Sequence, residues 1–469
     1  MSFRIFVSVL LGLLVPAAVQ AEPLVVTGAT LIDGTGGEPV KDAVIVMDQG
    51  RFIAVGPRGA VAVPPDAKLI DAKGKYVIPG LMNANVHLID GIMLMGIGGI
   101  EYLASYENAP PEVIEEGSQI ALANGMTTLF DTWNALEPAK IARDRIARGE
   151  VQGARIFIAG NILGMGGPFT ADFCLRCSET MSATFAKRMN DMFEAGVGRE
   201  LSGRTRDGVR QAVRDYTTKG VDFVKFAVSD HTPYGPYLTF SEAQMQAIVD
   251  ETRKAGLVVQ THTTSYESLR IAVDLGVDLM QHCTITLATP ISDEIVAKMK
   301  AKKVWCEIQP VTARFLSNNP QMKKRLPVME DNISKLIKSK APILMGTDAG
   351  VTDPDVLGAM PETSVTDRPW TLGNDHFLWF EAMVEKGMAP MDAIMAATSN
   401  VATAYKKSDL GVVAPAKIAD MVILDKNPLA DIHNMRSISM VIKDGVVVDR
   451  SRLPNPTVVS KRQNPVWTN

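Results

Sequence analysis

The chain has 469 residues, of which 46% are hydrophobic and 21% charged, and its formal net charge is −4. This length is more than one small core can organise, so we expect one large α/β domain or two to three domains. The balanced charge argues against a basic surface for nucleic acid or a membrane, which would need clustered lysine and arginine.

Residues 1–21, "MSFRIFVSVLLGLLVPAAVQA", have the features of a secretory signal peptide. One positive charge at Arg4 precedes an apolar run from Ile5 to Leu14, and small residues lead to Ala21. The apolar run is too short to span a bilayer comfortably. We therefore expect cleavage after Ala21 and a secreted or periplasmic protein, with an uncleaved anchor as the alternative. No later segment has the pattern of a transmembrane helix, so no membrane partner is expected after cleavage.

The next segment alternates short strand-like runs with Gly and Asp turns, as in "LVVTGATLID" and "AVIVMDQGRFIAVG". The end of the chain repeats this style in "KIADMVILDKNP" and "SISMVIKDGVVVD". Such patterns are typical of small β-domains. We expect residues 22–80 and 409–460 to form one β-sandwich around an inserted middle, with 461–469 as a tail.

The middle, residues 81–408, alternates apolar strand-like runs with helix-like stretches, which is the pattern of a (β/α)₈ TIM-like barrel. Residues 161–204 interrupt this regularity with a long segment rich in Gly, Met and Phe, which we expect to be a loop above strand 3. The eight strand candidates are "LMNANVHL", "MTTLFDTW", "ARIFIAG", "VDFVKFAV", "LVVQTH", "VDLMQHC", "KVWCEI" and "APILMGTD".

Polar residues recur at the ends of these strands, and a barrel would bring the strand ends onto one face. Imidazole and carboxylate groups are ligands of catalytic divalent metals, whose bound water becomes hydroxide near neutral pH. The pattern therefore predicts a hydrolytic metal site. Its candidate ligands are Asn85, His87, Lys225, His262, His282 and Asp348.

Each of these residues also has an ordinary structural explanation. A single histidine at a strand end is more often a hydrogen-bonded structural group than a ligand, and a single lysine usually reaches water. Lys225, however, is flanked by apolar residues in "DFVKFAV", where an unpaired ammonium would be costly. Only six histidines exist in the chain, and three of them stand at predicted strand ends. The joint pattern outweighs the separate explanations.

The four cysteines are too few for a disulfide scaffold. Cys283 and Cys306 lie in apolar strand-like runs, where we expect plain buried thiols. Cys174 and Cys177 form a CxxC pair, for which a local disulfide or two plain thiols is preferred over redox or metal chemistry.

Taken in order, these motifs identify the chain as similar to the amidohydrolase superfamily, within its imidazolonepropionase-like branch. The resemblance rests on "VIPGLMNANVHL", "VKF", "THTTSYESLRIAVDLGVDLMQHC" and "GTDAG", followed by "MAATSNVATAY" and "KIADMVILDKNPLADI". It covers nearly the whole chain after residue 21.

The resemblance implies a role for each candidate residue. Lys225 would carry a CO₂-derived carboxyl group that bridges two metals, with zinc favoured and cobalt or manganese as alternatives. His262 and His282 would hold the second metal, and His87 would help to hold the first. Asp348 would bind the first metal and act as general base. The candidate catalytic residues are Asp348 and His282. A homo-oligomer is also expected.

Asn85 departs from the His-x-His motif that is usual in the family. An amide oxygen is a weaker zinc ligand than imidazole. The first metal is then held loosely, or one metal suffices, or Asn85 only orients a water. An asparagine at this position resembles the phenylurea and thiocarbamate hydrolases, which cleave neutral ureas and carbamates.

The predicted loops after strands 1 and 3 are apolar and rich in Met and Gly, as in "LIDGIMLMGIGGIEYL" and "GNILGMGGPFTADF". They favour a small, largely apolar substrate, although such residues can equally pack over the barrel rim. Further candidates for the wall of the substrate pocket are Trp133, His231, Tyr234 and Tyr237.

The sequence therefore predicts a metal-dependent hydrolase that uses a metal-bound hydroxide to cleave an amide, urea or carbamate C–N bond in a small molecule. One alternative is a prolidase-like dipeptidase or carboxypeptidase, or an ochratoxin-type hydrolase of N-acyl amino acids. A deaminase is disfavoured, because deaminase relatives lack the strand 4 lysine. The alternative from another class is a non-catalytic binding protein whose metal site has decayed at Asn85.

Overall fold

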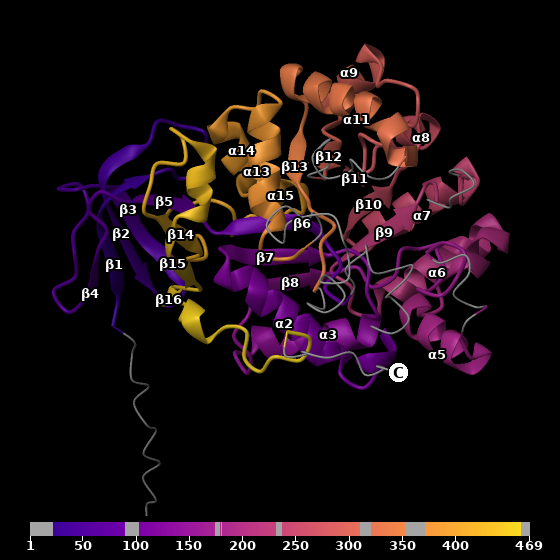
Figure 1. Ribbon diagram of the computed structural model, residues 1–469, viewed down its shortest axis with the longest axis horizontal. Coiled ribbons are helices and arrows are strands. Elements are labelled where there is room, and N and C mark those ends of the chain that lie inside the picture. The colour runs from indigo at the N-terminus through magenta and orange to yellow at the C-terminus, as the bar shows by residue number, and fades with distance from the viewer. Residues whose placement is uncertain are drawn as a thin grey trace, which may run out of the picture.

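The computed structural model describes residues 22–89, 103–173, 179, 181–230, 237–309, 320–351 and 371–460. The predicted signal peptide, the Cys174/Cys177 pair and the tail from 461 lie outside these residues. Figure 1 shows two parts, a small sheet domain at the left and a larger region in which helices surround a set of strands.

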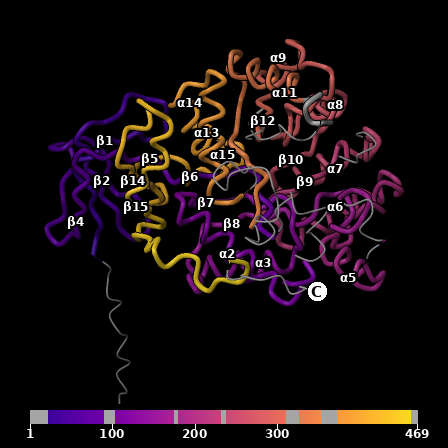
Figure 2. The backbone as a smooth tube through the Cα atoms, viewed as in Figure 1, coloured from indigo at the N-terminus to yellow at the C-terminus, as the bar shows by residue number. Residues whose placement is uncertain are grey.

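The small domain is built from both ends of the chain, and in Figure 2 the yellow C-terminal strands lie beside the indigo N-terminal ones. Its strands follow one hydrogen-bonded order, β16-β15-β14-β5-β1-β2-β3, and β4 pairs with β1. The two ends join where Tyr76–Pro79 of β5 runs antiparallel to Met421–Leu424 of β14. This pairing makes one continuous sheet rather than two separate ladders. The strands are β1 (Leu24–Leu31), β2 (Val40–Asp48), β3 (Arg51–Pro57), β4 (Lys68–Asp71), β5 (Tyr76–Pro79), β14 (Met421–Leu424), β15 (Ile438–Lys443) and β16 (Val446–Val447).

Alternating apolar residues give this sheet its core. Residues such as Val26, Ile45 and Ile423 are buried together on one face, while Val25 and Val44 form a smaller cluster on the other. This alternation follows from the two-residue period of a strand, which sends neighbouring side chains to opposite faces. The alternation of apolar and polar residues in the sequence therefore reflects the two faces of this sheet.

Gly80 marks the passage from the small domain into the larger region. Its N–H donates to the carbonyl of Asp420 at 2.9 Å. A Cβ at this position would lie 2.7 Å from Cγ2 of Thr127, which is closer than real Cβ contacts. The close approach of β5 and β6 to β7 therefore requires glycine at 80.

The larger region contains eight parallel strands in two hydrogen-bonded sheets, β6-β7-β8 and β9-β10-β11-β12-β13. Isolated parallel bridges join the sheets at both edges, Leu163 with Phe226 and Val86 with Ala349. The strands are thus arranged as a TIM-like ring, although the ladder is not continuous. All eight predicted strands form: β6 (Leu81–Val86), β7 (Met126–Asp131), β8 (Arg155–Ile158), β9 (Phe223–Ala227), β10 (Val258–His262), β11 (Leu279–Gln281), β12 (Trp305–Ile308) and β13 (Ile343–Met345).

Helices cover the outside of these strands (Figure 1), and their buried faces pack on the main hydrophobic core. Several begin at sequence-encoded caps. The α7 helix starts at a capping box, in which Ser241 accepts from the N–H of Gln244 and the Gln244 side chain accepts from the N–H of Ser241. Such a cap typically contributes about 1 kcal/mol. The helices are α2 (Pro110–Ala123), α3 (Leu136–Ala147), α5 (Ala183–Glu194), α6 (Arg206–Thr217), α7 (Glu242–Lys254), α8 (Tyr266–Leu275), α9 (Asp293–Lys302), α11 (Pro320–Lys338), α13 (Asp375–Glu385), α14 (Pro390–Ala396) and α15 (Ser399–Ala404), with 3-10 turns η2 (Arg199–Gly203), η4 (Ile432–Arg436) and η5 (Arg450–Arg452).

The segment 161–204 differs from the expected loop, because it contains α5 and η2. Ser182 caps α5 by accepting from the N–H of Phe185, and the helix buries Met189 and Phe193 on one face. The Met and Phe residues that made the segment look like an apolar loop are therefore partly the buried face of a helix.

Cys283 and Cys306 are joined in a disulfide, so the expectation of two plain thiols was wrong. Cys283 lies just beyond the end of β11, and Cys306 lies in the neighbouring strand β12, where it pairs with Met280 of β11. The Cα atoms of Cys283 and Cys306 lie 5.7 Å apart. That separation suits a disulfide. Strand register brings the thiols together, and register is not readable from the spacing of two cysteines.

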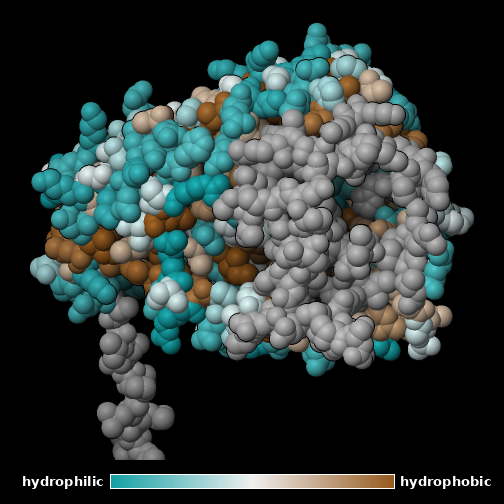
Figure 3. All heavy atoms as spheres, in the orientation of Figure 1, coloured by the Kyte–Doolittle hydropathy of each residue, from teal (hydrophilic) through white to brown (hydrophobic). Residues whose placement is uncertain are grey.

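Figure 3 shows hydrophilic surface over much of the upper edge and hydrophobic surface in a band across the small domain. Exposed apolar side chains of that domain include Ile53, Leu69 and Val446. Over the described part of the chain, we find no helix with both the length and the hydrophobicity needed to span a bilayer.

Candidate active site

The predicted metal ligands lie on the strands of the larger region or just after the carboxyl ends of these strands. His262 is the last residue of β10, and His282 follows β11 directly. Lys225 lies in the middle of β9, and Asp348 follows the end of β13. All the candidates are buried, with exposed fractions of 0% for Asn85, 2% for His87, 0% for Lys225, 3% for His262, 5% for His282 and 4% for Asp348.

Asp348 is the meeting point of this set. Its Oδ1 lies 3.1 Å from Nε2 of His87, and its Oδ2 lies 3.8 Å from Nε2 of His282. The rings of His282 and His262 are 4.7 Å apart, edge to face. Four residues that are far apart in the sequence therefore form one buried cluster.

The backbone fixes two of these residues in unusual conformations. His282 has φ 59° and Asp348 has φ 61°, both in the left-handed region that residues with a side chain rarely adopt. The N–H of Asp348 donates to the carbonyl of Asn85 at 2.8 Å, and the N–H of His87 donates to Ala349 at 2.9 Å. Contacts across the β6–β13 seam thus support the conformation of Asp348, as is common for strained backbone at functional sites.

A short hydrogen-bond chain connects Lys225 to Asn85. The Nζ of Lys225 donates to Oγ1 of Thr132 at 3.1 Å, and Thr132 donates to Oδ1 of Asn85 at 2.6 Å. In this chain the hydroxyl of Thr132 accepts from Lys225 and gives its own hydrogen to the amide oxygen of Asn85, so the amide nitrogen lies on the side away from Thr132. The amide nitrogen has no hydrogen-bond partner among the described residues. It lies on the side of the Glu307 and Asp348 carboxyl groups, where it opposes in small part the rise of their pKa values that burial causes.

Buried carboxyl groups surround Lys225. Burial raises the pKa of Asp131 to about 7, that of Glu307 to about 8 and that of Asp348 to about 6. Burial also lowers the pKa of Lys225 to about 8, although Asp348, Glu307 and Asp131 oppose this shift. Three buried acids therefore act on one buried amine, and burial opposes the ionisation of all three acids at once.

Sequence reasoning missed several members of this cluster. Glu307 is fully buried near the end of β12, and its Oε2 accepts from the N–H of His282 at 3.0 Å. Gln309 donates to Oδ2 of Asp348, and Asn134 donates to Asp131 at 2.6 Å. The available signal was a single acid inside an apolar run, as in "KVWCEI", because such an acid is costly unless it is paired.

The predicted substrate residues are less well placed. Trp133 is fully buried; its ring lies 5.6 Å from the ring of His87 and stacks on Phe173 at 4.2 Å. Tyr237 is 59% exposed. His231 and Tyr234 lie outside the described residues, so contact of these four residues with substrate stays a prediction.

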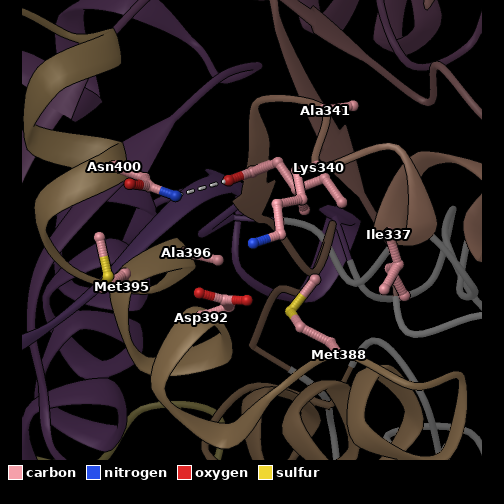
Figure 4. Close-up of a pocket in the computed structure, with 9 residues that line it drawn as sticks. Ile337, Lys340, Ala341, Met388, Asp392, Met395, Ala396 and Asn400 are labelled. Atoms are coloured by element: carbon pink, nitrogen blue, oxygen red, sulfur yellow. Dashed lines mark hydrogen bonds between the residues drawn. The ribbon is translucent and has the colours of Figure 1, made fainter. Parts of the chain in front are cut away.

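A cavity of about 140 Å³ lies at the other end of the strands (Figure 4). It is lined by residues of α14 and by the start of β13, where the Asn400 side chain donates to the carbonyl of Ile343 at 3.2 Å. Asp348 lies beyond the opposite end of the same strand. Because TIM-barrel active sites lie at the carboxyl ends of the strands, this cavity is separate from the candidate active site.

Comparison with known proteins agrees with this geometry. The family model described as "Amidohydrolase family" matches residues 76–448. The chain belongs to the amidohydrolase family. It is therefore a hydrolytic enzyme with a TIM-barrel-like fold, and the alternative of a non-catalytic binding protein is set aside.

Two solved structures are similar to nearly the whole chain. The structure of a molinate hydrolase has 48% sequence identity and a TM-score of 0.91, covering 96% of this chain and 99% of that one. The structure of phenylurea hydrolase B has 44% identity and a TM-score of 0.90, covering 94% and 99%. An imidazolonepropionase from Symbiobacterium thermophilum is 23% identical over 469 residues, covering 92% of this chain and 96% of the relative.

Amidohydrolases generally use divalent metal ions, and the side chains of this site can be compared with the ligands that such ions require. In the described parts of the chain, no three His, Cys, Asp or Glu side chains are already arranged to hold a metal. Two of the predicted ligands, Lys225 and Asn85, are of other types. The buried set nevertheless combines imidazole nitrogens with three acids around the single amine of Lys225, and a cation would favour the ionised form of these acids. This donor chemistry and this charge balance fit a divalent cation.

Proposed function

We propose that this amidohydrolase cleaves an amide, urea or carbamate C–N bond in a small, largely apolar molecule, with the help of a divalent metal. The observation that carries the proposal is the convergence of His87, His282 and Asp348 in one buried, acid-rich cluster. Similarity to the two hydrolases at 48% and 44% identity supports the type of substrate.

Each residue of the cluster has a role in this proposal. His87, His262, His282 and Asp348 would hold the metal, and Lys225 would join them once carboxylated by CO₂. Zinc is the favoured ion, with cobalt or manganese as alternatives. A metal bound here would polarise the substrate carbonyl and lower the pKa of a water molecule. Carboxylation would convert a buried amine that is costly to charge into an anionic ligand.

Asp348 is the proposed proton carrier. Its carboxylate contacts His87 and lies near His282, and Gln309 donates to its Oδ2, which fixes the orientation of the group. From this position Asp348 would accept a proton from the attacking water and deliver it to the leaving nitrogen. The left-handed backbone at Asp348 would keep the carboxylate in place.

The aromatic residues beside His87 support an apolar substrate. Trp133 packs against His87 and against Phe173 and Phe193, the last with a ring separation of 5.0 Å, and its Nε1 donates to Asn161 at 3.0 Å. We propose that this aromatic group forms one side of the substrate pocket, where it would offer little to a charged peptide. The dipeptidase alternative rests on structures with 22% identity, which show the fold alone.

The test combines metal content with turnover. Purified protein should contain divalent metal and hydrolyse members of a panel of anilides, phenylureas and thiocarbamates, and chelation should abolish this turnover until metal is restored. Turnover that survives complete removal of metal would refute the metal-dependent mechanism. Hydrolysis of N-acyl amino acids in preference to the panel would favour the dipeptidase alternative.

Export remains part of the proposal. The segment 1–21 would be removed after Ala21, and a buried disulfide between Cys283 and Cys306 suits an oxidising compartment. N-terminal sequencing of the exported protein tests this directly. Assembly into a homo-oligomer stays a prediction from the family resemblance.

A further inference from the structure

Glu307 is a buried acid for which the proposed mechanism has no use. It lies in β12, its side chain is fully buried, and its Oε2 accepts from the N–H of His282 at 3.0 Å. Its other oxygen, Oε1, has no hydrogen-bond partner among the residues that the structure describes. A buried carboxylate oxygen without a partner is costly, so an acid at this position needs a specific reason.

The neighbouring strand leaves room for this acid. A Cβ at Gly346 would lie 2.7 Å from Cδ and 2.5 Å from Oε1 of Glu307, so any other residue at 346 would displace this side chain. Gly346 has no positive φ that would require glycine for the backbone. The glycine therefore accommodates the Glu307 side chain, just before Asp348 on the same segment.

The surroundings of Glu307 are the predicted metal ligands. Nδ1 of His282 lies 3.8 Å from Oε2 of Glu307, and the charges of Asp348 and Lys225 both act on this carboxyl group. The Asn85 amide turns its oxygen to Thr132 and hence its nitrogen to the acids. In this orientation Asn85 presents its N–H₂ group, which can only donate, to the side of the acids, and its oxygen is already engaged by Thr132.

We propose that Glu307 belongs to the metal site and supplies the donor that Asn85 does not, because Asn85 stands where the family motif has a histidine. In this arrangement, Oε1 of Glu307 binds the ion, Oε2 stays on the N–H of His282, and Asn85 is a positioning residue. The inference rests on the proposed function, since it requires a divalent metal at this site.

A purely structural role is the alternative, in which Glu307 only holds the backbone of His282. The substitution Glu307→Gln separates the two roles, because glutamine keeps an oxygen that can accept from the N–H of His282 but loses the charge. Glu116→Gln is a matched control. Glu116 is also buried, with 1% exposure, and it accepts from backbone N–H groups near residue 459, away from the cluster.

The experiment titrates the metal-free full-length protein with Co²⁺ and follows the visible absorption of the bound ion together with metal content. We expect Glu307→Gln to weaken Co²⁺ binding at least about tenfold and to change the spectrum, and Glu116→Gln to match the wild type. Asn85→His in the Glu307→Gln background should restore much of the affinity by returning an imidazole. Glu307→Asp, which keeps the charge on a shorter side chain, should fold and give an altered spectrum, which covers the case in which the glutamine variant is unstable.

The outcomes separate this inference from the proposed function. Equal Co²⁺ affinity and identical spectra in wild type, Glu307→Gln and Glu307→Asp would overturn the role of Glu307. Wild type that binds Co²⁺ but hydrolyses nothing in the panel would refute the proposed function and leave the role of Glu307 standing. Wild type that binds no divalent ion would overturn both.

Discussion

Nε2 of His87 lies 3.1 Å from Oδ1 of Asp348, across the seam where the first strand of the ring meets the last. Both side chains are buried, and the backbone bonds from Asp348 to Asn85 and from His87 to Ala349 hold the two strand ends together. The contacts that join the first strand to the last therefore also place His87 beside Asp348. A change that opened this seam would be expected to damage fold and function together.

The substitution Asp348→Asn should abolish hydrolysis while leaving the fold intact. Asparagine has nearly the same shape but cannot accept a proton, so we expect a loss of about 10²–10⁴-fold in kcat. Turnover and circular dichroism measure the two effects. Asp278→Asn is the control, because Asp278 accepts from the N–H of Val259 at 2.8 Å at the opposite end of the strands. Turnover by Asp348→Asn within tenfold of the wild type would refute the assigned role.

The stability of the metal-free protein should fall as pH rises from about 5 to 8. Burial raises the pKa of Asp348 to about 6, of Asp131 to about 7 and of Glu307 to about 8. Between the ordinary carboxyl pKa and these values the folded state binds more protons than the unfolded state, so rising pH destabilises the fold. Lys225, with a pKa of about 8, stays mostly protonated over most of this window.

A divalent cation should cancel this trend, because it compensates the same charges. Thermal unfolding of chelator-treated protein at several pH values, with and without added Zn²⁺, measures both effects. We expect Tm to drop by at least about 2 °C over the window without metal and to change less with it. A metal-free Tm that rises with pH would show that these acids are not buried as described.

Much of the fold was predictable from the sequence, because its signals are local. The two-residue period of the small domain and the eight apolar runs of the ring each reflect burial of one segment. Polar residues at strand ends, such as His262 and Asp348, were also visible, since they interrupt apolar runs. Their convergence followed once the runs were assigned to one ring.

The parts that could not be predicted depend on contacts between segments. Thr132 takes part in the site because its hydroxyl contacts both Lys225 and Asn85. Glu307 can lie in the site because Gly346 leaves space for its side chain. The disulfide between Cys283 and Cys306 depends on the register of two strands. The spacing of residues within one segment does not predict which residues of other segments they will contact.

Removing the disulfide should lower stability and loosen the site. Cys283 follows His282, and Cys306 precedes Glu307, so the bond joins the backbones that carry both residues. For a loop with a sequence separation of 23, the chain-entropy model gives a loss of about 3 kcal/mol in the free energy of unfolding. Denaturant unfolding of Cys283→Ala/Cys306→Ala tests this value. A single peptide pair linked under non-reducing conditions should confirm the bond in the wild type, and labelling of both thiols without reductant would contradict it.

Thr132→Val should impair both stability and turnover, although valine has nearly the same shape as threonine. The hydroxyl of Thr132 accepts from Lys225 and donates to Asn85, and both partners are fully buried. Valine would leave the Lys225 nitrogen, which keeps an N–H whether or not it is carboxylated, and the Asn85 amide oxygen without this partner, at about 1–3 kcal/mol for each group. Thr132→Ser keeps the hydroxyl, so it should stay close to the wild type in denaturant unfolding and in turnover. If the valine and serine variants behaved alike, the hydrogen-bond chain from Lys225 to Asn85 would have no role, and the assigned orientation of the Asn85 amide would lose its basis.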